Sequence, residues 1–325
     1  MGPCCNPPQA LTGLPHLPDR SGPALGPGAW ARHSAAGIAA LVVLAASAPA
    51  ASPPYQTMGF LKIPPEAKAG VMSGIDIDRQ GNIYLLHRGE QPMAKFNSKG
   101  QYVKSWGAGL FKVAHVVKAG PDGNIWTADN GNHVLRVFTP EGQLLRTIGE
   151  VGVPGNDATH FRAPDDILWA SNGHYYVADA GNGRIIHFDG GGKYLGQWGK
   201  KGNGPGEFSA AHSMIIDKQD RIYVGDRGNK RIQVFDRDGK FLAEWTGFGN
   251  PFGMAIVGKG KEMLSSEGDL HKMYLLDKAT GKILAEWGDR ETFMLPHLMA
   301  VDKKGRVYLT EVSGGRVQIL KRSAR

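Results

Sequence analysis

The chain contains almost no cysteine: its two cysteines, Cys4 and Cys5, stand at the start of 325 residues. Thiolate metal sites, cysteine nucleophiles and disulfides are therefore excluded from the rest of the chain. It also has no polybasic block, so the formal net charge of +8 favours acidic ligands only in a general way. We expect no nucleic-acid partner. Neither a coiled-coil heptad pattern nor a long amphipathic helix is present.

The first 50 residues differ from the rest. Residues 1–30 are rich in proline and glycine, which indicates disorder or a start codon placed too early. Arg32 then precedes an apolar run at 35–46, which leads to a small-residue Ala-x-Ala pattern ending at Ala50. This order is typical of a secretory signal, and the run is too short for a mature membrane span. We therefore expect a secreted or periplasmic protein with no membrane partner after cleavage.

An internal repeat fills the remaining chain. Each unit holds four short runs rich in Val, Ile, Tyr, Phe and Trp, separated by turn signals such as Asp-x-x-Gly-Asn. Six four-stranded units of this length are typical of an all-β fold, the six-bladed β-propeller. The units span residues 74–107, 115–149, 164–199, 212–245, 252–288 and 297–321.

The sixth unit is one strand short, because the chain ends soon after its third run. Residues 58–64 (MGFLKIP) have the apolar pattern of a fourth strand, and we expect them to complete the last blade. Such an N-terminal strand closes the ring and leaves no open sheet edge. The sequence thus predicts one propeller over residues 55–321, expected to be a monomer. The tryptophans that recur near the ends of fourth strands are expected to pack between blades.

Three histidines stand at one position of alternate units, where the innermost strand begins. His115, His212 and His297 belong to the second, fourth and sixth units. On a closed ring they lie about a third of a turn apart and face the channel. Three imidazoles with a fourth position open can hold a divalent metal. Zinc is preferred, while iron, copper or nickel remain alternatives, as does a trio of purely structural histidines.

Two arginines are expected at the same mouth of the channel. The second strand of each unit runs antiparallel to the first, so its end returns to the face where the histidines begin. Arg88 and Arg227 follow that strand end in the first and fourth units. A guanidinium there suits a substrate carboxylate through two parallel hydrogen bonds. The remaining histidines share no position, and an acidic residue at the end of the second strand is expected to cap turns.

Several motifs resemble a known family, the bacterial relatives of peptidyl-α-hydroxyglycine α-amidating lyase among the NHL-repeat propellers. They are LLHRG at 85–89, WGAGLF at 106–111, GEVGVPGND at 149–157, GPGEF at 204–208, GDRGNKRIQVFD at 225–236 and LPH at 295–297. The resemblance implies a zinc held by His115, His212 and His297, with Arg88 and Arg227 in the active site. It also implies a carbon–nitrogen lyase that cleaves a C-terminal α-hydroxyglycine, releasing a peptide amide and glyoxylate.

The sequence departs from that family in two places. The family's catalytic tyrosine has no counterpart, because Ala180 and Gly181 follow the third unit's V-A-D run. The family's calcium-binding aspartate is replaced by Leu298, so calcium loses a ligand.

Two functions therefore stay open. One is an exported zinc-dependent lyase acting on a small carboxylated or peptide-like substrate. The other is a non-catalytic, metal-containing propeller that binds a peptide or protein partner on its loop face. A lactonase-like enzyme is disfavoured. Propellers of that kind typically hold their metal at the channel with Glu, Asn and Asp, and not with three histidines.

Overall fold

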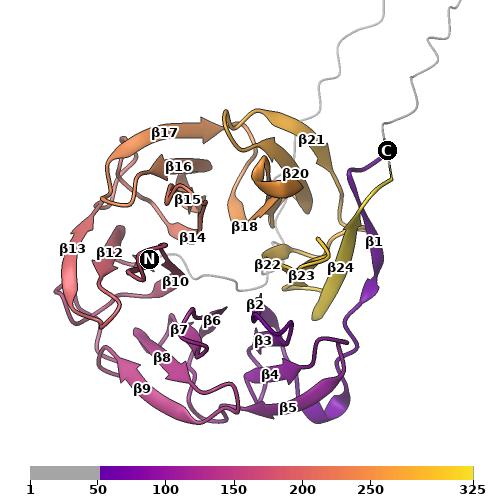
Figure 1. Ribbon diagram of the computed structural model, residues 1–325, viewed down its shortest axis with the longest axis horizontal. Coiled ribbons are helices and arrows are strands. Elements are labelled where there is room, and N and C mark those ends of the chain that lie inside the picture. Colours follow the sequence, from indigo (N-terminus) through magenta and orange to yellow (C-terminus); the bar gives the residue numbers. More distant parts are fainter. Residues whose placement is uncertain (1–51, 325) are drawn as a thin grey trace, which may run out of the picture. The chain divides into compact units, whose positions relative to one another are not determined.

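The computed structural model describes residues 52–324, which form an all-β ring of six four-stranded antiparallel sheets (Figure 1). The six-bladed β-propeller predicted from the repeats is confirmed. Neighbouring innermost strands lie side by side around the ring, and the last of them returns to the first. The expected secretory signal, residues 1–50, lies outside the described residues. Within residues 52–324, no helix has the length and apolar character needed to cross a membrane.

The blades follow the chain order, each from its innermost to its outermost strand. Blade one consists of β2 (Met72–Ile77), β3 (Ile83–His87), β4 (Met93–Phe96) and β5 (Tyr102–Trp106). Blade two consists of β6 (Ala114–Ala119), β7 (Ile125–Asp129), β8 (Val134–Phe138) and β9 (Leu144–Ile148). Blade three consists of β10 (Pro164–Trp169), β11 (Tyr175–Asp179), β12 (Arg184–Phe188) and β13 (Tyr194–Trp198).

The remaining blades have the same order. Blade four consists of β14 (Ala211–Ile216), β15 (Ile222–Asp226), β16 (Arg231–Phe235) and β17 (Phe241–Thr246). Blade five consists of β18 (Pro251–Val257), β19 (Glu262–Glu267), β20 (Lys272–Asp277) and β21 (Ile283–Trp287). Blade six consists of β22 (Pro296–Val301), β23 (Val307–Glu311), β24 (Arg316–Arg322) and β1 (Tyr55–Phe60). Three short 3-10 turns are η1 (Pro65–Ala67), η2 (Arg227–Asn229) and η3 (Gly258–Gly260).

The N-terminal strand closes the ring as expected, but it begins and ends earlier than residues 58–64. Strand β1 pairs antiparallel with β24, with Tyr55 opposite Arg322. The strand ends at Phe60, and the chain then continues to Pro64 and to Pro65, which opens the turn η1. Closure places every blade between two neighbours, which removes the free edges of a linear repeat.

The tryptophans at the ends of fourth strands join neighbouring blades. Gly142 adopts φ of +89°, and a Cβ added there would lie 2.7 Å from the Trp106 ring of the preceding blade. Glycine is therefore required both by the backbone and by the ring above it. The same packing joins Trp198 to Gly239 and Trp245 to Gly281, while Trp287 stacks on Tyr55. The blade-packing role expected from the sequence is confirmed.

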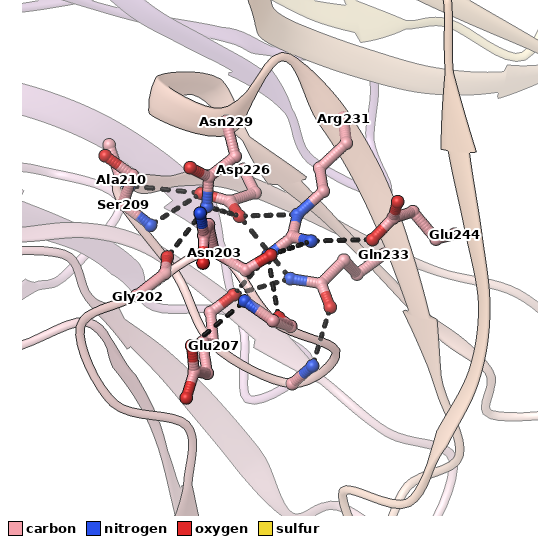
Figure 2. Close-up of polar contacts among 12 residues, drawn as sticks. Gly202, Asn203, Glu207, Ser209, Ala210, Asp226, Asn229, Arg231, Gln233 and Glu244 are labelled. Atoms are coloured by element: carbon pink, nitrogen blue, oxygen red, sulfur yellow. Dashed lines mark hydrogen bonds and ion pairs between the residues drawn. The ribbon is translucent and has the colours of Figure 1, made fainter.

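A buried acid at the end of the second strand holds the segment that leads into the channel. In blade four, Asp226 accepts the backbone N–H groups of Ser209 and Ala210, and it pairs with Arg231 at 2.9 Å (Figure 2). Arg231 also donates to Glu244. The acids that receive the corresponding N–H groups in the other blades are Asp129, Asp179, Glu267 and Glu311. These acids fix the entry to the innermost strand in five blades, and the turn capping expected from the sequence is seen at Asp129 and Glu267, which accept the N–H groups of Asn132 and Leu270.

Blade one has a buried histidine at this position. Nδ1 of His87 accepts the N–H of Gly89 at 3.1 Å and that of Gly70 at 3.4 Å, as the carboxylates do elsewhere. Nε2 has no partner, and burial lowers the pKa of His87 to about 4. The neutral ring thus replaces a carboxylate as an acceptor.

This arrangement predicts a pH-dependent stability. The folded pKa of His87 lies below its unfolded value, so the unfolded chain binds more protons between about pH 4 and 6.5 and stability falls as the pH falls. At pH 5 the loss is about 2 kcal/mol. In His87→Asn the amide oxygen keeps an acceptor but cannot titrate. Urea unfolding of the metal-free proteins at pH 7 and pH 5 measures how far the unfolding free energy falls with pH. This decrease should be about 2 kcal/mol smaller in His87→Asn than in wild type. An equal loss in both proteins would contradict the assignment.

Candidate metal centre

A β-bulge in each innermost strand turns one side chain toward the channel. The pairing of innermost and second strands shifts register in all six blades at the residue where the histidines were predicted. A bulge inserts one residue and re-aims its side chain. The residues at this ring position are Ser73, His115, Asp165, His212, Phe252 and His297. The bulge therefore creates a ring of six side chains at one level of the channel.

Each histidine of this ring is fixed by the next blade. Nδ1 of His115 lies 2.7 Å from the carbonyl oxygen of Asp165, and His212 makes the same contact with Phe252. His297 completes the pattern with the carbonyl oxygen of Ser73, also at 2.7 Å. Because a carbonyl oxygen only accepts, Nδ1 carries the proton in all three rings. The second nitrogen, Nε2, is left with a lone pair available to a metal.

The three rings converge on one point. Their candidate ligand atoms all lie within 4.8 Å of one another. Within residues 52–324, these three histidines form a group that could hold a metal ion. Nε2 of His115 is 3.2 Å from Nε2 of His212. With the proton on Nδ1, two lone pairs face each other across this gap. A cation between them removes the repulsion, so the donor set fits a three-imidazole zinc site.

Burial keeps these imidazoles neutral. All three side chains are almost fully buried. Burial lowers the pKa of His297 to about 3, and it lowers the pKa of His115 and His212 well below the usual range. The arginine charges nearby lower them further. Protons therefore compete weakly for Nε2 at neutral pH, which favours metal binding.

The structure brings both predicted arginines to the histidine ring. Nε of Arg88 donates to the carbonyl oxygen of Ala114, the residue before His115, at 3.3 Å. The Arg227 guanidinium lies 4.9 Å from the centre of the Phe252 ring, which itself contacts His212. Charges of both arginines act on the histidine pKa values. The mouth therefore combines three neutral nitrogen donors with two cations.

Two neighbouring groups were not singled out in the sequence. Asp165 is buried in the ring, where its carboxylate accepts from the Asn130 amide and lies 3.9 Å from Nδ1 of His115. Lys201 donates to the carbonyl oxygens of Ala180 and Ser209, at 2.7 and 2.9 Å. The repeat alignment could have indicated Asp165, because it occupies the histidine position. No repeat signal marks Lys201, which stands in a loop between blades.

Comparisons with known proteins agree on the fold. A family described as a 6-bladed beta-propeller matches residues 153–247. Among solved structures, a streptogramin B lyase superposes with a TM-score of 0.60 and 14% identity, covering 83% of this chain and 98% of that chain. A virginiamycin B lyase from Staphylococcus aureus gives 0.60 and 15%, with 82% and 88% covered. At this identity the likeness concerns the fold alone.

Curated relatives add a distant sequence similarity. A probable peptidyl-alpha-hydroxyglycine alpha-amidating lyase from Caenorhabditis elegans is 28% identical over 156 residues, which are 40% of this chain and 45% of the relative. A peptidylglycine alpha-amidating monooxygenase from Rattus norvegicus is 30% identical over 156 residues, covering 39% and 16%. The chain thus spans less than half the length of the curated relatives it matches. It is a six-bladed propeller with distant similarity to amidating lyases.

Proposed function

We propose that this propeller is a zinc-dependent carbon–nitrogen lyase that cleaves a carboxylated, peptide-like substrate of the α-hydroxyglycine type. The observation that carries the proposal is the convergence of three Nε2 atoms whose protons are fixed on Nδ1 by the next blade. Similarity to amidating lyases supports the substrate class. Export stays part of the proposal, because residues 35–50 have the sequence of a secretory signal.

Zinc at the three histidines would supply Lewis-acid polarisation of a substrate oxygen. His115, His212 and His297 would hold it, and the chain's own polar residues would orient the substrate. In the proposed cleavage, the hydroxyl proton leaves, the carbinol carbon becomes a carbonyl and the C–N bond breaks. The amide nitrogen then takes up a proton, so the products are glyoxylate and a peptide amide.

The arginines would bind the substrate carboxylate. Arg227 is held over the Phe252 ring, and Arg88 is held against the strand that carries His115. Their fixed positions lower the entropy lost when a carboxylate is bound in two parallel hydrogen bonds. The carboxylate would then sit beside the metal-facing nitrogens. This placement orients the hydroxyl on the neighbouring carbon toward the same point.

One observation favours the second candidate, a non-catalytic propeller that binds a peptide or protein partner. Ala180 and Gly181, which stand where the family tyrosine is expected, have no hydroxyl, and the carbonyl oxygen of Ala180 accepts a hydrogen bond from Lys201. No phenol is therefore supplied from this position to accept the substrate proton. Product formation separates the two candidates.

We expect zinc-loaded protein to release glyoxylate from an α-hydroxyglycine peptide, and Arg227→Met to lower kcat/KM about 100-fold. Loss of a desolvated charged contact costs about 3 kcal/mol, which corresponds to that factor. Arg290→Met is the matched control, because Arg290 is an exposed arginine on a loop. Wild type, Arg227→Met and Arg290→Met should contain equal amounts of zinc. Glyoxylate absent from zinc-loaded wild type would favour the binding propeller instead.

A further inference from the structure

Two hollows lie at the opposite face of the ring from the histidines, on either side of the β22–β23 turn at 302–306. The innermost strands begin at the histidine mouth, so the turns that follow them are at the other face. The larger hollow has a volume of about 760 Å³ and the smaller about 390 Å³. The larger one is built from the start of β1, the η3 turn, the β22–β23 turn and the end of β24. Its size is that of a small-molecule site.

The larger hollow has a strong excess of positive charge. Six basic residues line it, against a single acidic residue, Asp302. Asp302 pairs with Arg306 at 2.6 Å, and Glu262 pairs with Arg322. The other four basic residues of the lining are Lys259, Lys303, Lys304 and Lys321, and Nζ of Lys303 donates to the carbonyl oxygen of Arg79 at 2.7 Å. Four like charges around one concave surface attract an anion, and a bound anion relieves their mutual repulsion.

The walls between these lysines are apolar. Tyr55, Val257 and Val301 line the hollow, and Tyr55 and Val257 are nearly inaccessible to solvent. Met58, which also lines it, is 54% exposed. A ligand that fits both features has a compact anionic group and an apolar portion. Lysine ammonium groups suit phosphate oxygens as point charges, without the planar geometry that favours a carboxylate on arginine.

We propose that this hollow binds a phosphate ester that carries an apolar group. Its lysines contact the phosphate, and Met58 with the apolar wall contacts the organic portion. The same chemistry is presented by an anionic phospholipid in a bilayer and by a soluble phosphate ester. The site is independent of the histidine centre, since none of its lining residues belongs to that centre.

The test compares two fourfold variants with the same net charge. The hollow variant carries Lys259→Gln, Lys303→Gln, Lys304→Gln and Lys321→Gln. The rim variant carries Lys99→Gln, Lys193→Gln, Lys218→Gln and Lys240→Gln, all exposed lysines at hairpin turns of blades one, three and four. Titration calorimetry at low salt uses monomeric dihexanoyl phosphatidylglycerol, with dihexanoyl phosphatidylcholine and inorganic phosphate as reference probes.

We expect wild type to bind the phosphatidylglycerol probe about tenfold more tightly than either reference probe. The hollow variant should lose about tenfold in affinity and the rim variant less than threefold. Co-sedimentation with phosphatidylglycerol vesicles then identifies the source: retention by vesicles indicates a bilayer lipid, and binding of the monomeric probe alone indicates a soluble ester. Equal losses in both variants, or no preference of wild type over the reference probes, would overturn the proposal.

Discussion

His212→Ala is expected to reduce bound zinc from about one equivalent to less than a tenth after reconstitution. The variant keeps two of three converging nitrogens. The free energy of zinc binding to structural sites in small peptides is about 10–16 kcal/mol. Divided among the ligands of one site, this gives about 3 kcal/mol or more for each ligand. Affinity should therefore fall at least 100-fold. Metal analysis by mass spectrometry after dialysis provides the measurement, and His115→Ala and His297→Ala should behave alike.

His174→Ala serves as the control for that loss. His174 is a partly buried histidine of the same domain that shares a hydrogen bond of 2.9 Å with His187, away from the ring position. It should retain a full equivalent of zinc. Circular dichroism of each variant separates loss of the ligand from loss of the fold. Full zinc occupancy in a folded His212→Ala protein would refute the three-histidine centre.

Asp226→Ala is expected to cost about 3–5 kcal/mol of unfolding free energy, the largest effect on stability. The substitution removes the carboxylate that pairs with Nε of the buried Arg231, which keeps its contact with Glu244, and it leaves two backbone N–H groups, of Ser209 and Ala210, without this acceptor (Figure 2). Breaking a buried ion pair by removing one partner has this cost. For a domain of this size it lowers Tm by about 10 °C.

Asp238→Ala is the matched control, since Asp238 is an exposed aspartate in the next hairpin of the same blade. It should change the unfolding free energy by less than about 0.5 kcal/mol. Because Ser209 and Ala210 lead into β14, Asp226→Ala should also weaken zinc binding at His212. If Asp226→Ala lowered the unfolding free energy by less than about 1 kcal/mol, solvent would have replaced the contacts of Asp226, which would contradict the prediction.

The repeats specified the blade number, the alternation of the histidines and the face shared with the arginines. They could do so because strand period and turn residues repeat in the chain itself. Residues 58–64 indicated ring closure, but the strand Tyr55–Phe60 begins three residues and ends four residues earlier, since apolar residues continue past its end. Pattern alone does not mark where pairing stops.

The finer geometry of the centre depends on contacts between blades. The bulge at the ring position arises in the pairing of the first two strands of a blade, and the carbonyl partner of each Nδ1 belongs to the next blade. No side-chain pattern encodes either backbone feature. The same reason explains why Lys201 was not singled out: its position results from a loop folding back on Ala180. The sequence thus indicated the three candidate ligands, and the structure indicates why each Nε2 atom has a lone pair to offer.

X-ray absorption at the zinc edge of reconstituted wild-type protein tests the three-histidine centre most directly. A zinc ion at Nε2 of His115, His212 and His297 should show three imidazole nitrogens at about 2.0–2.1 Å and one exchangeable oxygen ligand. The multiple-scattering pattern of imidazole should disappear in His212→Ala. A shell of six oxygens, or an imidazole pattern unchanged by the three histidine substitutions, would contradict the proposed metal centre.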